Sequence, residues 1–211
     1  PIPYHLHKTG EIEFYSLSRV VALAVSGFWK NQDSEAGDLK VVNLFVPESN
    51  LAELNTNLPH SGYQYVKGSL WHENKLQKMK FRYRGDYVYH WGYRKKSFRV
   101  KTSKKKLYED TRAFNLIAPK QLETHFGCLL AREMGLIAPR TDLVEVTLNG
   151  KLLGPHAYVE QLEELTLRKN GRMPGDLYAG EAAAKDTYRG VGSQIFNHPQ
   201  LWEKIAINNH Y

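Results

Sequence analysis

Residues 79–102, MKFRYRGDYVYHWGYRKKSFRVKT, decide the fold of this chain. Apolar residues at 79, 81 and 83 alternate with basic residues at 80, 82 and 84, and the alternation returns at 97–101 in SFRVK. Successive side chains of a strand lie on opposite faces, so a period of two predicts two strands, each with one apolar and one basic face. The loop that joins them contains glycine.

Further strands are predicted on both sides of this pair. A strand is expected at 41–46, and residues 63–84 should form two antiparallel strands that turn near residues 73–74. Later in the chain, Asn149-Gly150 joins two β-rich runs. This dipeptide is a strong sequence signal of a tight hairpin.

Two helices complete the predicted pattern. Pro47 opens a short helix, and the main helix runs from about residue 119 to Gly135, a natural C-terminal stop. The apolar residues of the main helix follow helical spacing: Leu122, Phe126, Leu129 and Leu130. Cys128 lies among them and is interpreted as a small core residue. The expected fold class is therefore α+β, an antiparallel sheet with one main helix.

Positive charge is concentrated in one part of the chain. The 211 residues include 29 Lys and Arg and 22 Asp and Glu, and residues 66–106 alone hold 14 basic and two acidic residues. Such a cluster suits phosphate or another anion, but it is also the ordinary composition of a solvated face. The single cysteine cannot form an intramolecular disulfide, so the fold must depend on its packed core.

The first 38 residues are interpreted as an N-terminal extension that ends in a polar linker. Ten uncharged residues lie between Arg19 and Lys30, about half the roughly 20 needed to cross a bilayer, so no membrane span is expected. Their length suits either the remnant of an export signal or a buried helix or strand. The chain begins with Pro and ends at Tyr211 without a closing signal, and it is expected to be a fragment.

The order of the predicted elements is that of the small lobe of a protein kinase. In such a lobe, a loop between two strands covers the nucleotide phosphates, a lysine neutralises them, and one helix braces that lysine. A hairpin then leads to the hinge that binds adenine. Phosphoryl transfer needs positioned cations more than covalent chemistry, which a basic sheet beside a glycine-containing loop can supply.

Three blocks of sequence resemble the spore-coat protein H (CotH) kinase family in order and spacing. The first is residues 79–102, quoted above. The second is FNLIAPKQLETHFGCLLAREMGLIAPRTDLVEVTLNGKLLGPHAYVEQLE (114–163), and the third is NGRMPGDLYAGE (170–181). The similarity runs from about Val41 to Glu181. The resemblance implies an atypical protein kinase, secreted or associated with the cell envelope. Such an enzyme uses ATP with Mg or Mn to phosphorylate Ser or Thr of protein substrates. Residues 39–163 would be the small lobe with its hinge, and 164–211 the start of a helical large lobe.

The resemblance also implies a set of ATP-binding residues: Arg84, Gly85, Lys95, Lys96, Glu133 and Glu160. Arg84-Gly85 matches the start of the family's phosphate loop, and Lys95-Lys96-Ser97 matches a Lys-Lys-Ser strand. Alternation along a strand would send the two lysines to opposite faces, so only one can face the nucleotide. Lys96 is the first candidate and Lys95 the alternate.

The other two candidates follow from the helix and the hairpin. Glu133, late in the main helix, could brace the lysine or could equally be a solvated charge. Tyr158-Val159-Glu160 matches the hinge, where Glu160 would help to orient adenine. Asp176-Leu177-Tyr178 matches a recurrent Asp-Leu-Tyr to which no role is assigned.

Two departures from the family pattern limit the prediction. The family usually has Ser-Ser after Arg-Gly, whereas this chain has Asp86 and Tyr87, and an acid there would repel a phosphate unless it points away or binds metal. The catalytic and metal-binding acids of the family lie in a later region and are expected beyond Tyr211. No catalytic or metal-ligating residue is therefore assigned in this chain.

Two other classes of protein remain open. A secreted or cell-surface adhesin-like module could use the basic surface without catalysis. A nucleic-acid binder could use the same surface with stacking aromatics, namely Tyr83, Tyr87, Tyr89 and Trp91, although no nucleic-acid partner is expected.

Overall fold

The computed structural model describes residues 39–85, 88–118, 122–173, 175–179 and 202–206. Within these residues the chain divides into two compact units, of which one ends at Gln161 and the other begins at Leu162. The uncharged run between Arg19 and Lys30, the loop residues 86–87 and the last five residues lie outside the described part.

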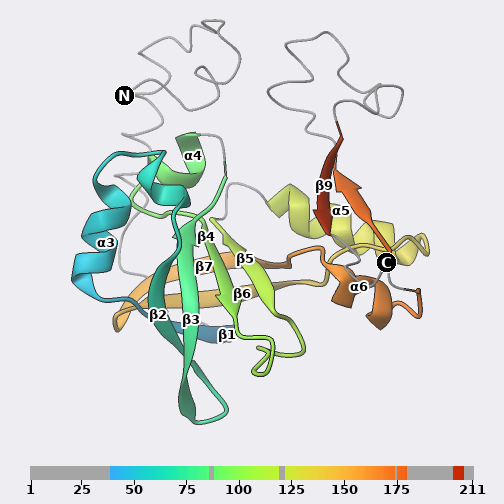
Figure 1. Ribbon diagram of the computed structural model, residues 1–211, viewed down its shortest axis with the longest axis horizontal. Helices are drawn as coiled ribbons and strands as arrows, with labels where there is room; N and C mark the ends of the chain where they lie inside the picture. Colours follow the sequence, from blue (N-terminus) through green and yellow to red (C-terminus); the bar gives the residue numbers. More distant parts are fainter. Residues whose placement is uncertain (1–38, 86–87, 119–121, 174, 180–201, 207–211) are drawn as a thin grey trace, which may run out of the picture. The chain divides into compact units, whose positions relative to one another are not determined.

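A barrel of seven strands forms the first unit (Figure 1). The strands are β1 (Lys40–Phe45), β2 (Val66–His72), β3 (Lys75–Tyr83), β4 (Phe98–Thr102), β5 (Ala113–Ile117), β6 (Thr141–Leu148) and β7 (Lys151–Glu160). Their order around the barrel is β1-β2-β3-β4-β5-β7-β6. The α+β class is confirmed, but the prediction of an antiparallel sheet was wrong in one respect. Strand β1 also pairs with β6 in parallel, which closes the sheet and pairs both of its edges.

Both predicted hairpins are present. Glu73 and Asn74 have φ values of 49° and 58°, and Asn149 and Gly150 have φ values of 53° and 80°. Positive φ at both central residues is what a two-residue turn of type I′ requires, and Asn and Gly adopt it at low cost. The turn at Asn149 is also fastened to β1, because its side chain accepts a hydrogen bond from Val46 N (2.8 Å) and donates one to Val46 O (2.7 Å).

The described helices of the first unit are short. They are α3 (Glu48–Asn55), the 3-10 helix η1 (Ser61–Tyr63), α4 (Val88–Trp91) and α5 (Leu122–Glu133). Pro47 is the N-cap of α3, and Gly135, with φ of 76°, follows the end of α5, as the sequence predicts. Helix α5 packs against β6 and β7. Its expected apolar face is nevertheless open, since Phe126 and Leu130 are 62% and 63% exposed.

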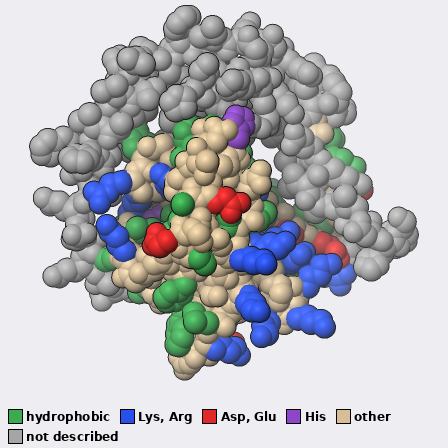
Figure 2. Space-filling model, turned by 60° about the vertical axis from the view of Figure 1, so that its left-hand side comes forward, with side chains coloured by type: hydrophobic (Ala, Val, Ile, Leu, Met, Phe, Trp, Pro, Cys, Tyr) green, Lys and Arg blue, Asp and Glu red, His purple; other side chains and the backbone are tan. Residues whose placement is uncertain are grey.

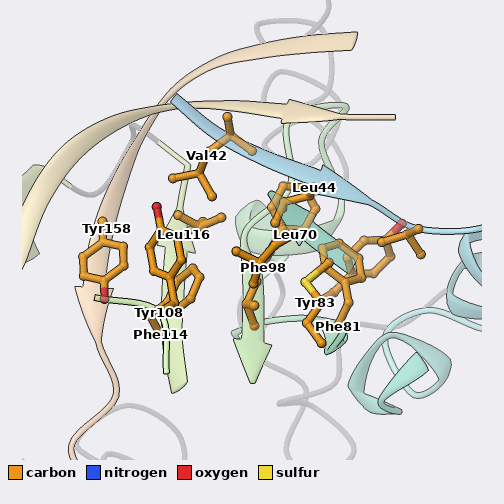
Figure 3. Packing of buried hydrophobic residues seen from close by; sticks show 14 of the residues in the cluster. Val42, Leu44, Leu70, Phe81, Tyr83, Phe98, Tyr108, Phe114, Leu116 and Tyr158 are labelled. Carbon is orange, nitrogen blue, oxygen red and sulfur yellow. The ribbon is translucent and has the colours of Figure 1, made fainter. Parts of the chain in front are cut away.

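The core fills the barrel with the apolar faces of its strands (Figure 3). Phe81 lies 5.1 Å from Phe98 and Phe114 lies 5.0 Å from Tyr158, measured between ring centroids. The alternation predicted from residue 79 onward is confirmed, because Met79, Phe81 and Tyr83 are buried while the intervening basic residues are exposed or half-buried. The basic faces of β3 and β4 therefore lie on the outside of the barrel.

The second unit has three described elements, α6 (Glu164–Lys169), β8 (Leu177–Ala179) and β9 (Glu203–Ala206). A capping box between Glu163 and Thr166 starts α6, and β8 pairs with β9 in antiparallel fashion. The sequence pattern predicted short helices here and missed the two strands. Among the described helices of the chain, none is long and apolar enough to cross a membrane.

Candidate functional site

The loop from Arg84 to Ser97 joins β3 to β4 and can be built only around a glycine. Gly85 has φ of 94°, and a Cβ atom at this position would lie 2.0 Å from Cδ2 of His90. Tyr63 OH donates a hydrogen bond to Gly85 O at 2.8 Å. The backbone at Gly85 therefore packs directly against the imidazole, which no residue with a side chain would allow.

Ser97 closes the base of this loop. It is fully buried, its backbone N–H donates to His90 O at 2.7 Å, and its carbonyl accepts from Arg84 N at 2.9 Å. Its hydroxyl lies 3.0 Å from His90 Nδ1 and accepts a hydrogen bond from Ala118 N at 3.0 Å. These contacts hold both ends of the loop at one end of the barrel.

Lys95 and Lys96 lie in this loop, not in β4. The prediction that they belong to the strand was wrong, because regular pairing starts only at Phe98. Both side chains are half-buried. The alternation of strand faces therefore does not apply to these two residues, whose ammonium groups nevertheless have different surroundings.

Lys96 is held by protein groups. Its Nζ donates to Tyr93 O at 3.0 Å and lies 5.5 Å from the ring centroid of Tyr83. Burial lowers the pKa of the Lys96 ammonium, since a desolvated cation is less stable. The side chain therefore fixes the end of the loop against the core.

Lys95 is influenced by a carboxylate that the sequence prediction missed. Burial lowers the pKa of the Lys95 ammonium, and the negative charge of Glu145 on β6 opposes that shift. Glu145 is only 4% exposed, and its Oε2 has no hydrogen-bond partner within the described residues. The sequence signal for this residue was a lone glutamate in the otherwise uncharged β-rich run LVEVTL (143–148).

Glu133, the predicted brace, lies elsewhere. It is exposed at the C-terminal end of α5, and among the described contacts no hydrogen bond or ion pair joins it to Lys95 or Lys96. Of the two outcomes that the sequence left open, the solvated charge fits the structure better. Glu145 is the carboxylate whose charge acts on Lys95.

His156 links the loop to β7. Its Nε2 lies 3.2 Å from Lys96 O and its Nδ1 lies 3.0 Å from Gly154 O, while its ring stacks on Phe98 at 5.8 Å. Burial lowers the pKa of His156 to about 4. The ring is therefore neutral at pH 7 and carries one N–H, which can donate to only one of the two carbonyl groups at a time.

The predicted hinge lies at the C-terminal end of β7. Glu160 is 4% exposed; its Oε2 accepts a hydrogen bond from Arg140 N at 3.2 Å, and its N–H donates to Arg140 O at 2.8 Å. From His156 to Glu160 the strand spans about 13 Å. The carboxylate thus has a protein partner, and its contribution to adenine binding stays a prediction.

A polar chain on the outer face of the barrel leads to the hinge and was also missed. Arg99 Nε donates to Asn115 Oδ1 at 2.8 Å, and Asn115 Nδ2 donates to Gln161 Oε1 at 3.2 Å. Asn115 is 3% exposed, so its amide is a buried polar group satisfied by these neighbours. An asparagine inside the apolar run AFNLI was the sequence signal.

The structure excludes two of the four aromatic residues that a nucleic-acid binder could use. Tyr83 and Trp91 are only 4% and 5% exposed, so they cannot act as stacking platforms for nucleic-acid bases. The side chains of Tyr87 and Tyr89 lie outside the described part. Within the described residues, no group of three or more His, Cys, Asp or Glu side chains could hold a metal ion.

Comparison with known proteins identifies the family of this chain. A search of curated proteins finds no match. The model of the family described as CotH kinase protein matches residues 81–206, which begin in β3 and include the loop, the hinge and both strands of the second unit. Membership of a kinase family implies the use of ATP and of protein substrates. Because the match covers more than half of its residues, the chain belongs to the CotH kinase family.

Proposed function

We propose that this chain supplies the nucleotide-binding part of a protein kinase that transfers the γ-phosphoryl group of ATP to Ser or Thr of a protein. The observation that carries the proposal is the loop between β3 and β4, in which Gly85 and two desolvated lysines are held at one end of the barrel. The loop lies inside the region that matches the family. We further propose that the protein is secreted or bound to the cell envelope and that the chain is part of a longer enzyme.

In this proposal Lys95 is the lysine that faces the phosphates. The ammonium of Lys96 already donates to Tyr93 O, whereas Lys95 lies within the electrostatic influence of the buried Glu145. An anion beside a half-buried ammonium interacts more strongly than it would in bulk water, because the effective dielectric constant is lower. Glu145 would orient Lys95 as the helix glutamate orients the lysine in other kinases.

The remaining groups position the loop and the nucleotide. Gly85 lets the backbone of the loop approach His90 closely, Arg84 stands at its start, and Ser97 fixes its base. Backbone groups of the hinge, at the end of β7, would hold adenine. Mg or Mn would neutralise charge on the phosphates during transfer. We assign neither a metal ligand nor a catalytic acid among the residues of this chain.

Nucleotide-dependent thermal shifts test the role of Lys95. We expect ATP with Mg²⁺ or Mn²⁺ to raise the melting temperature of the unsubstituted protein, called the parent below. The substitution Lys95→Ala should lower the affinity for ATP at least tenfold. Lys105→Ala, in an exposed turn, is the matched control and should bind as the parent does. If Lys95→Ala shifts as much as the parent, Lys95 has no such role.

Transfer itself needs a separate assay. Parent protein incubated with γ-labelled ATP and a Ser-rich or Thr-rich protein should give an acid-stable label on hydroxyl side chains. If nucleotide neither binds nor reacts while the protein still attaches to surfaces, the adhesin-like function replaces the kinase function.

A further inference from the structure

Three lysines lie side by side on the outer face of the barrel. In the strand register Lys67 on β2 is opposite Lys80 on β3, and Lys80 is opposite Lys101 on β4. Neighbouring strands are about 4.8 Å apart, so the three side chains emerge within about 10 Å of one another. Like charges directly opposite each other destabilise a sheet, and this row has two such pairs.

The row lines a hollow of about 1260 Å³ that crosses the strands. Its charged lining residues are Lys67, Lys78, Lys80, Lys101, Arg112 and Glu48. Phe45 and Tyr65 add exposed apolar surface, and Ser69 and Ser103 add hydroxyl groups. Lys and Arg side chains also gather on the face that Figure 2 shows. The hollow therefore combines five cationic side chains with a lining surface that is mainly apolar.

Within the described part of the chain, this charge is offset by one carboxylate and by no ion pair. None of its ion pairs includes any of the five basic residues. The single acid, Glu48, accepts a hydrogen bond from Asn149 at 3.3 Å. At the wall, Nε of Arg112 is buried without a hydrogen-bond partner among the described residues.

This charge pattern selects a compact anion with more than one charge. A phosphate ester on Ser or Thr carries −1.5 to −2 charges and three acceptor oxygens, so several ammonium groups can converge on it. A carboxylate carries one charge and cannot offset three adjacent cations. Peptide side chains next to the phosphate could pack on Phe45 and Tyr65, which are exposed. The aromatic residues among the lining are Phe45 and Tyr65, and the ring of Tyr65 lies 5.1 Å from the Arg82 guanidinium.

We propose that this hollow binds a phosphorylated Ser or Thr segment of a protein. The origin of the phosphate rests on the proposed kinase function, since such segments are its products. The site itself is separate, because the lining takes in Lys101, Thr102 and Ser103 at one end of β4, whereas the loop with Lys95 precedes the other end. A kinase that retains its product here would modify neighbouring hydroxyl groups of one substrate in succession.

Fluorescence anisotropy with synthetic peptides, in the absence of ATP, tests the proposal. The probe is a labelled peptide with two phosphoserines, compared with its unphosphorylated form and with a glutamate form of equal net charge. We expect the phosphopeptide to bind at least tenfold more tightly than either, and its affinity to fall with added salt.

The variant Lys80→Gln/Lys101→Gln should bind the phosphopeptide at least tenfold more weakly, because it lacks two of the cations. It should fold normally, because the substitutions remove like-charge pairs. Lys75→Gln, at the exposed tip of the same hairpin, is the control and should stay within twofold of the parent. Full binding by the double variant would overturn the proposal. Equal binding of the glutamate peptide or of single-stranded DNA would also overturn it. Because no nucleotide is present, these results do not depend on whether the kinase function holds.

Discussion

At the scale of single residues, the candidate site depends on groups that are buried but polar. Ser97, His156 and Glu145 are each less than 5% exposed, and they lie around the two lysines of the loop. Burial makes the charge state of each group depend on its immediate partners. The sequence identified the lysines, whose cluster stands out, but not these partners. A buried polar residue differs from an exposed one only through the tertiary fold.

The buried His156 makes the stability of the barrel depend on pH. The pKa of this imidazole is about 4 in the folded chain and about 6.5 in an unfolded one. The unfolded chain therefore binds more protons between these values, so stability is complete above pH 6.5 and falls as pH approaches 4. We expect His156 to contribute a loss of roughly 3 kcal/mol over this interval.

Denaturant unfolding at pH 7 and at pH 4.5 measures this contribution. His156→Gln cannot gain a proton, so its free energy of unfolding should change less between the two pH values than that of the parent. Equal changes in both proteins would show that His156 does not titrate as the fold requires.

At the scale of elements, local sequence patterns predicted strands and turns well, whereas pairings between segments distant in the sequence were not predicted. Alternation identified β3 and β4, and Asn-Gly identified the turn between β6 and β7. Strand β5 was missed because all five of its residues are buried, so its sequence does not alternate. The parallel pairing of β1 with β6 was missed because it joins segments about a hundred residues apart. No local pattern records such a contact.

The turn at Asn149 should contribute to closing the barrel. Asn149→Ala removes two hydrogen bonds to Val46 and places a less tolerant residue at positive φ, so we expect a loss of about 2 to 4 kcal/mol in stability. Asn149→Gly removes the same bonds but accepts the backbone conformation, and it should cost about 1 to 2 kcal/mol. Urea unfolding at pH 7 compares them. Parent-like stability in both variants would mean that the turn does not hold β1.

At the scale of the whole molecule, the barrel separates two basic regions. The loop from Arg84 to Ser97 precedes the start of β4, and the lysine-lined hollow takes in the end of the same strand. The excess of positive charge in residues 66–106 indicated that an anion could bind. The sequence alone could not indicate two separate anion-binding sites, because only the closed barrel assigns each cation to one face and one end of the barrel.

Hydrogen exchange of the parent protein, with and without ATP and Mg²⁺, tests the central claim most directly. If the loop binds the nucleotide, amide exchange should slow at residues 84–97 and at Glu160-Gln161, and exchange in the β2–β3 hairpin should stay unchanged. Unchanged exchange in the loop at a saturating ATP concentration, or slowing confined to that hairpin, would contradict the claim that this loop is the nucleotide site.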